Sequence, residues 1–250
     1  MLQVCLNGSR NRAECPLLPI SADELAVAAR DAVKAGAEAV HLHPKKPDGT
    51  DTLDPAIVAE TVTKVRAAVP GIPIGVTTGA WTTPDPQLRA ELVRQWTALP
   101  DYASANWHEN GVELVVRALL EKDIGVEAGI YSGTDAATRF RVSPLADSVI
   151  RVLAEVMNSS AKTATLTGER LLSDLRGVRA PILLHGENEG AWSVLRMAAR
   201  LHLDTRIGLE DVLHDPEGTP TASNPTLVRA AKHVLSHPDS TGTRGDRRRG

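Results

Sequence analysis

The sequence predicts an α/β protein, a single-domain (β/α)₈ TIM barrel. Short apolar runs alternate with helical patterns along the chain, which is typical of parallel strands covered by helices. Eight such units follow one another, and 250 residues is the usual length of a closed barrel of eight. An open, doubly wound sheet is the alternative, and eight units in this length favour closure.

The expected strands are short apolar or β-branched runs bounded by polar or turn-forming residues. In chain order they cover Leu2–Leu6, Ala39–His43, Ile74–Thr77, Tyr102–Ala105, Gly125–Ile130, Val149–Glu155, Ile182–His185 and Thr205–Leu209.

The helices between them are predicted from apolar residues at helical spacing and from end signals. Ser21 with Glu24 three residues later forms a capping box. Asp54 followed by Pro55 marks the start of the second helix. The later helices are expected near Pro86–Ala98, Val112–Lys122, Asp135–Arg141, Lys162–Leu175, Ala191–Leu201 and Pro225–Leu235.

The barrel is expected to occupy residues 1–238. Residues 239–250 are polar and basic without periodicity, which predicts a disordered tail. A phosphate-binding role for Arg247–Arg249 is the alternative for this segment.

Composition excludes several classes of protein. A net charge of −3 gives no strong field toward nucleic acid or an anionic membrane, and no apolar run could span a bilayer. The first residues lack the pattern of a signal peptide, and two cysteines suit a reducing compartment, so we expect a cytoplasmic protein. Glycine-rich nucleotide-binding signatures are absent from the sequence. With two cysteines, a metal site must use histidine and carboxylate ligands.

His41 and His43 are separated by one residue at the end of a predicted strand, so both side chains face the same side of the sheet. Glu210 follows the last predicted strand. In a closed barrel that strand is beside the first, which is beside the second, so the carboxylate can meet both imidazoles. Two histidines and a carboxylate are a common catalytic zinc set. The alternative for His41 and His43 is a hydrogen-bonded pair near a loop.

Several segments together resemble one family, the β-keto acid cleavage enzymes, whose founding activity is 3-keto-5-aminohexanoate cleavage. The similarity runs from Met1 to about His237. Its most specific part is HLH combined with RIGLED in the right order and distance. The segments are NG…ECPLLP (Asn7–Pro19), AGAEAVHLHP (Ala35–Pro44), DG (Asp48–Gly49), TTG (Thr77–Gly79), SANWHENG (Ser104–Gly111), VEAG (Val126–Gly129), LLHGE (Leu183–Glu187) and RIGLED (Arg206–Asp211).

The resemblance implies a Zn²⁺-dependent barrel that converts a β-keto acid and acetyl-CoA into acetoacetate and a new acyl-CoA. It implies zinc ligation by His41, His43 and Glu210. It also implies proton transfer by Asp211 assisted by Arg206 and Thr77, substrate handling by Glu14, and a homo-oligomer, a tetramer or dimer. From the residues alone, an inward arginine such as Arg206 is costly in a barrel unless it is paired.

Two further residues are candidates for substrate binding. Asn106 follows the fourth strand and could contact the substrate carboxylate, whereas Glu127 within the fifth strand is either near the site or a barrel-wall carboxylate bonded to arginine. His185 ends the seventh strand, either near the substrate or as a structural histidine, and Trp81 could wall the pocket.

The segment after HLH departs from the family pattern. Lys45 or Lys46 could supply the positive charge expected there, or both could be solvated. The rival functions are a metal-dependent aldolase or hydrolase that does not use CoA, and a non-catalytic barrel that binds a keto acid.

Overall fold

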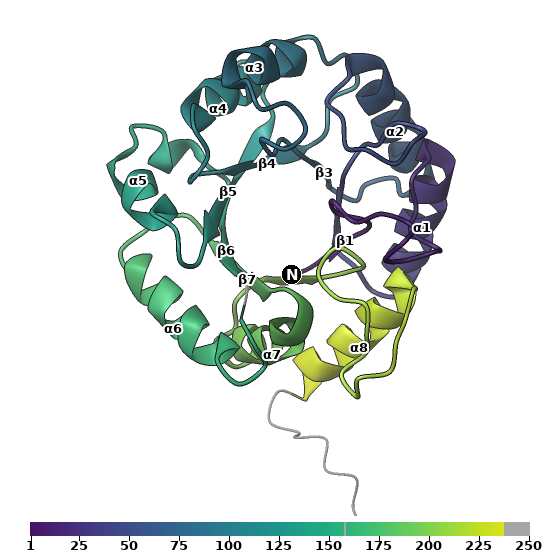
Figure 1. The fold of residues 1–250 in the computed structure, drawn as a ribbon, viewed down its shortest axis with the longest axis vertical. Helices are drawn as coiled ribbons and strands as arrows, with labels where there is room; N and C mark the ends of the chain where they lie inside the picture. The colour runs from purple at the N-terminus through teal and green to yellow at the C-terminus, as the bar shows by residue number, and fades with distance from the viewer. Residues whose placement is uncertain (158, 238–250) are drawn as a thin grey trace, which may run out of the picture.

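The computed structural model describes residues 1–157 and 159–237, and within them eight parallel strands form the wall of a barrel (Figure 1). The expected tail, 239–250, and its boundary lie outside the described residues. The strands are β1 (Leu2–Cys5), β2 (Ala39–Leu42), β3 (Ile74–Thr77), β4 (Tyr102–Asn106), β5 (Gly125–Tyr131), β6 (Arg151–Val156), β7 (Ile182–Gly186) and β8 (Thr205–Ile207).

The strands follow one another in the order β7-β6-β5-β4-β3-β2-β1-β8, so the sheet closes on itself where β7 meets β8. A parallel bridge joins Leu183 of β7 to Asp204 before β8, and the Leu184 amide donates to the Asp204 carbonyl at 2.9 Å. The single-domain (β/α)₈ barrel is therefore confirmed, and the open-sheet alternative is wrong.

The helices form a ring outside the strands (Figure 1). Ser21 and Glu24 make the expected capping box at the first helix, and Asp54 caps the second through the amides of Ala56 and Ile57. Their bounds are α1 (Ala22–Lys34), α2 (Pro55–Ala68), α3 (Pro86–Arg94), α4 (Val112–Leu120), α5 (Ala136–Val142), α6 (Ala164–Asp174), α7 (Ala191–Arg200) and α8 (Asn224–Ser236), with the 3₁₀ turns η1 (Ala146–Ser148) and η2 (Asn188–Gly190).

The last strand ends two residues before the predicted end at Leu209. At Gly208 an added Cβ would lie 1.9 Å from the Cys5 carbonyl oxygen, so the backbone passes too close to β1 for a side chain. The amides of Asp211 and Val212 then donate back to the Gly208 carbonyl. Glu210 therefore lies on a turn beyond β8 rather than directly after the strand.

Strand residues that face outward, such as Val4 and Val40, are buried against the helices in one hydrophobic core. The inside of the barrel is polar instead, because buried Gln3, His41 and Glu127 are interleaved with those apolar residues. Buried polar groups are costly unless they are paired, so this interior needs an internal network of partners or a bound ligand. Among the described residues, no helix is long and apolar enough to cross a membrane.

Candidate active site

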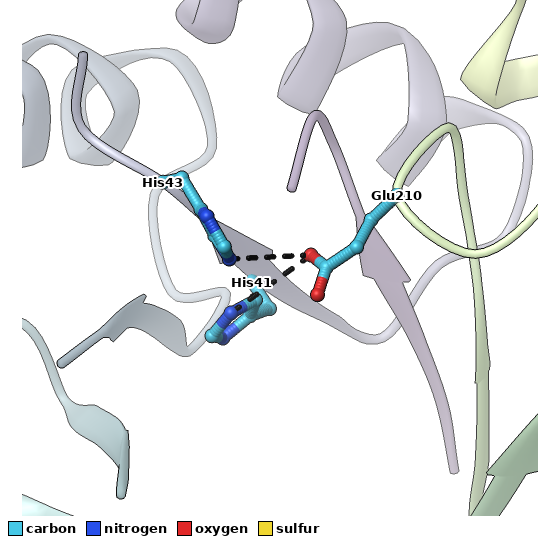
Figure 2. Close-up of side chains that lie close together, drawn as sticks. All are labelled: His41, His43 and Glu210. Atoms are coloured by element: carbon cyan, nitrogen blue, oxygen red, sulfur yellow. Dashed lines mark ion pairs between the residues drawn. The ribbon is translucent and has the colours of Figure 1, made fainter. Parts of the chain in front are cut away.

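Three side chains from the ends of β2 and β8 converge at the carboxyl end of the barrel. Glu210 Oε2 lies 3.6 Å from His43 Nε2 and 4.0 Å from His41 Nε2. Figure 2 shows the two imidazoles from one side and the carboxylate from the other pointing toward a common space. The alternation argument for the histidines and the closure argument for Glu210 therefore bring the expected three residues together.

This trio fits a divalent metal ion. Two ligands bound tetrahedrally at about 2.1 Å lie roughly 3.4 Å apart, close to the distances seen here. Glu210 Oε2 and His41 Nδ1 are buried and find no hydrogen-bond partner among the described residues. A buried carboxylate oxygen that faces two imidazole nitrogens and lacks a donor is the acceptor a cation would satisfy. The set of two nitrogens and one oxygen suits zinc, and several other divalent transition metals also accept it.

His43 is held in place from behind by Asp51, which lies in the loop after β2. Asp51 Oδ2 is 2.8 Å from His43 Nδ1, and Asp51 Oδ1 accepts from Lys45 Nζ. Trp81 Nε1 also donates to Asp51 Oδ2 at 2.8 Å, while its ring stacks on His43 at 5.9 Å between centroids. Because His43 Nδ1 donates its proton to Asp51, its Nε2 faces Glu210. Lys45 is a buried ion-pair partner of Asp51.

The two histidines differ in charge preference because their partners differ. Burial lowers the pKa of His41 to about 3, and the Glu210 carboxylate only partly opposes it. Burial also favours the neutral form of His43, but Glu210 and the hydrogen bond to Asp51 outweigh it and raise the pKa to about 9. Carboxylates thus surround His43 on both nitrogens.

Arg206 in β8 ties the carboxylates of the site together. Its Nη2 donates to Glu210 Oε1 and to Asp211 Oδ1, both at 2.9 Å, and its Nε donates to His185 Nδ1 at 3.2 Å. The inward arginine is therefore paired, as its burial requires. It turns Glu210 so that Oε2, the other oxygen, faces the histidines.

Asp211 is bonded through only one of its two carboxylate oxygens among the described residues. Its Oδ1 is bonded to Arg206, whereas its Oδ2 is buried and has no partner among the described residues. Burial raises the pKa of Asp211 against the opposing charge of Arg206. Because His185 Nδ1 accepts from Arg206, the His185 proton is on Nε2; burial and Arg206 lower its pKa to about 3.

A cavity of about 140 Å³ opens beside these groups at the barrel mouth. Trp81 lines it, as expected, and so do four of the expected site residues, namely His43, Arg206, Glu210 and Asp211. The other lining residues are Ser9, Tyr131, Glu155, Met157, His185 and Glu187. A larger groove of about 790 Å³ lies between the first loop, α1 and the start of α8, and none of the three metal-site residues lines it.

Thr77 and Glu14 are not among the residues that line this cavity. Thr77 is buried at the end of β3, level with His43 by the strand register, and its hydroxyl accepts from the Gly79 amide at 3.2 Å. The Glu14 side chain is 45% exposed and accepts from Arg10 Nη1. Arg10 Nε in turn donates to the Glu210 carbonyl at 3.1 Å, so Glu14 reaches the site through Arg10.

Asn106 is at the end of β4, but its amide Nδ2 donates to Glu109 Oε1 at 2.9 Å. Nδ2 carries a second hydrogen that can donate, but Asn106 is not among the residues that line the cavity, so substrate binding by Asn106 stays a prediction. Glu127 lies below the site, where its Oε1 accepts from Gln3 and is 3.0 Å from Arg151 Nε. Of the two interpretations left open, the geometry corresponds to the barrel-wall carboxylate bonded to arginine.

Asp51 and Glu155 are among the site and cavity residues that were not anticipated. The sequence shows Asp51 as an acidic residue in the loop that follows HLH, and nothing in that pattern predicts its contact with His43. Glu155 is the last inward position of a predicted strand, and alternation from Arg151 and Leu153 could have identified it.

Comparisons with known proteins identify the family and the fold. A sequence model of the β-keto acid cleavage enzymes matches residues 1–242. The chain is 24% identical over 228 residues to a 3-keto-5-aminohexanoate cleavage enzyme from Fusobacterium nucleatum, covering 85% of this chain and 82% of that protein.

Among solved structures, apo ObcA superposes with a TM-score of 0.63 at 16% identity, covering 90% of this chain and 63% of ObcA. A ternary complex of ObcA with a C4-CoA adduct and oxalate superposes with a TM-score of 0.64 at 15% identity, covering 88% of this chain and 64% of that chain. This chain therefore spans somewhat less than two thirds of ObcA. The 3-dehydroquinate dehydratase from Geobacillus kaustophilus superposes with a TM-score of 0.60 at 12% identity, covering 94% of this chain and 91% of the dehydratase. At these identities the structures show the shared barrel fold.

Proposed function

The chain belongs to the family of β-keto acid cleavage enzymes, and from that premise we propose that it exchanges acyl groups between a β-keto acid and acetyl-CoA with a bound Zn²⁺ ion. The products would be acetoacetate and a new acyl-CoA. One observation carries the proposal: Oε2 of Glu210 faces His41 and His43 beside Asp211, and within the described part of the chain neither this oxygen nor Asp211 Oδ2 has a hydrogen-bond partner.

In this proposal His41, His43 and Glu210 hold the metal. The bound ion would act as a Lewis acid that polarises the keto oxygen and makes the neighbouring CH₂ group more acidic. Arg206 and Asp51 position two of the ligands by the hydrogen bonds described above. Such supporting bonds fix the orientation of metal ligands and the choice of histidine tautomer.

Asp211 is the proposed base. Its Oδ2 takes a proton from C2 of the β-keto acid, and the resulting carbanion attacks the thioester carbonyl of acetyl-CoA, releasing CoA thiolate. The thiolate then attacks the original keto carbon, and the bond between that carbon and C2 breaks. Asp211 then returns the proton to C2. The products are acetoacetate and the new acyl-CoA thioester, so atoms and charge balance. Arg206 keeps Asp211 oriented throughout, and the Thr77 hydroxyl assists it.

CoA use is supported by the family and by the fold neighbour ObcA, whose structure holds a C4-CoA adduct. An experiment with acetyl-CoA labelled in its acetyl group tests the proposal. Labelled acetoacetate and an unlabelled new acyl-CoA are the expected products. Cleavage of the β-keto acid without CoA would indicate the rival aldolase or hydrolase. Binding without any turnover would indicate a non-catalytic barrel.

We also propose a homo-oligomer, a dimer or tetramer, in the cytoplasm. Light scattering on the purified protein measures the assembly mass directly, and a mass of one chain would contradict this part of the proposal.

A further inference from the structure

Arg10, in the loop after β1, contacts three segments at the carboxyl end of the barrel. Its Nε donates to the Glu210 carbonyl at 3.1 Å, and its Nη2 donates to Asn188 Oδ1 at 2.8 Å. Its Nη1 donates to Glu14 Oε2 at 3.2 Å within its own loop. The guanidinium therefore bridges the loops after β1, β7 and β8, while Ser9 rather than Arg10 lines the cavity beside them.

Asn188 carries this contact on to Asp211. Asn188 is the first residue of η2, and its backbone amide donates to the Asp211 carbonyl at 2.7 Å. Its φ of 50° is in the left-handed region, which is uncommon for residues other than glycine and is tolerated best by asparagine and aspartate. Such a backbone conformation persists where surrounding contacts hold it, and Arg10 and Asp211 supply two such contacts.

The turn that carries Glu210 and Asp211 is held from outside. Both residues lie beyond the end of β8, and Glu210 projects from this turn rather than from a strand (Figure 2). Their backbone amides donate to carbonyls of β1 and of the turn itself. Their own carbonyls accept from Arg10 and from the Asn188 amide, which belong to the two neighbouring loops. A Cβ added at Gly8 would lie 2.4 Å from Glu210 Cγ, so the first loop also packs against this side chain.

We propose that Arg10 is a positioning residue: together with Asn188 it clamps the turn after β8, so that Glu210 keeps its place as a metal ligand and Asp211 its place as the base. This inference rests on the proposed function for the roles of Glu210 and Asp211. A guanidinium suits the task because its planar fork donates to several acceptors in fixed directions. Arg10 holds the backbone of the turn, whereas Arg206 donates to the two carboxylates themselves.

Binding of Co²⁺ to metal-free protein tests the clamp without turnover, because Co²⁺ accepts the same nitrogen and oxygen ligands as zinc and absorbs visible light. Arg10→Gln should weaken Co²⁺ binding by about 10-fold and change the visible spectrum of the bound ion, as expected when a contact that orients a ligand is lost. Arg12→Gln is the matched control, because Arg12 lies in the same loop but bonds to Leu18 and Glu24. Its Co²⁺ affinity and spectrum should equal those of wild type.

Two substitutions at Asn188 separate its side-chain contact from its backbone conformation. Glycine adopts a left-handed φ readily but removes the acceptor for Arg10, so Asn188→Gly should also weaken Co²⁺ binding. Asn188→Asp keeps an acceptor oxygen and should bind Co²⁺ as wild type does. Steady-state kinetics give a second readout: kcat of Arg10→Gln should fall by about 10-fold with KM unchanged, because the contacts of Arg10 are with the turn.

Hydrogen–deuterium exchange measures the turn itself, independently of turnover. The amides of residues 208–212 should exchange faster in Arg10→Gln than in wild type or Arg12→Gln. If no β-keto acid is turned over but Arg10→Gln weakens Co²⁺ binding and accelerates this exchange, the proposed reaction fails and the positioning role stands. Wild-type Co²⁺ affinity and exchange in a folded Arg10→Gln variant, or a higher KM with unchanged kcat, would overturn the inference.

Discussion

His43 Nδ1 and Asp51 Oδ2 lie 2.8 Å apart, and this contact joins the candidate metal site to the loop that follows β2. The Asp51 carboxylate also accepts hydrogen bonds from Lys45 and Trp81, so two donors besides His43 hold it in place. The direction of the His43 imidazole is thereby set by residues that are not among the three proposed metal ligands.

Replacing Asp51 with asparagine should weaken metal binding by about 10- to 100-fold, the usual effect of losing such a supporting carboxylate. The metal dissociation constant, measured by competition with a chelator, checks this. Asp48→Asn is the matched control, because Asp48 lies in the same loop but its carboxylate accepts hydrogen bonds from Thr50 rather than from His43. Equal affinities for the Asp51→Asn variant and wild type would show that the His43–Asp51 contact does not orient the ligand.

Arg206→Lys should lower kcat by about 10²-fold or more, the size of a lost acid–base contribution. A lysine has one ammonium and cannot reproduce the fork that contacts Glu210, Asp211 and His185 together. Steady-state kinetics measure the change, with circular dichroism to verify folding. Arg94→Lys, at a surface pair with Glu121, should behave as wild type. A folded Arg206→Lys variant with more than half of the wild-type rate would refute the assigned role.

Stability should fall as pH rises from about 5 to 8 through Glu127. Burial raises its pKa from 4.5 to about 7, only partly opposed by Arg151, so the folded state holds a proton that the unfolded state releases. The group's contribution is fully present below pH 4.5 and is lost on passing pH 7, a change of roughly 3 kcal/mol.

Urea unfolding of wild type and Glu127→Gln at pH 5 and pH 8 isolates this effect. Wild type should lose about 3 kcal/mol relative to the variant between the two pH values. If the free energy of unfolding changed equally with pH in wild type and variant, the ion pair with Arg151 would be keeping Glu127 charged across this pH range.

Gly129→Ala should destabilise the fold by about 1 to 3 kcal/mol, the usual cost of overpacking. The new methyl group would collide with Asn106 Oδ1 and crowd Glu155. Gly168→Ala is the control: it lies within α6, where alanine favours the helix and the nearest atom is the flexible Met197 sulfur at 3.1 Å. Thermal unfolding compares the two, and equal midpoints would show that the β5 wall yields to the added methyl.

The barrel and the core of the metal site were predictable because both follow from short-range patterns. Alternation puts His41 and His43 on one face, and closure of an eight-stranded barrel brings the chain after β8 to them. Asp51 could not be found this way, because a loop bridge between Lys45 and Asp51 positions it, and no periodicity encodes a loop.

Glu155 and Glu127 show a second limit. Alternation predicts that both face inward, yet it does not reveal which carboxylate meets an arginine. Arg151 sits opposite Glu127 in the strand register, whereas Glu155 has Tyr131 and His185 as neighbours. That difference depends on the stagger between strands, which is a property of the closed barrel as a whole.

Metal content tests the central claim most directly. Elemental analysis of purified wild-type protein should find about one zinc ion per chain. His43→Ala should lose the ion, and His233→Ala, which changes an exposed histidine of α8, should retain it. A folded wild-type protein that contains no divalent metal and binds none when it is supplied would contradict the account.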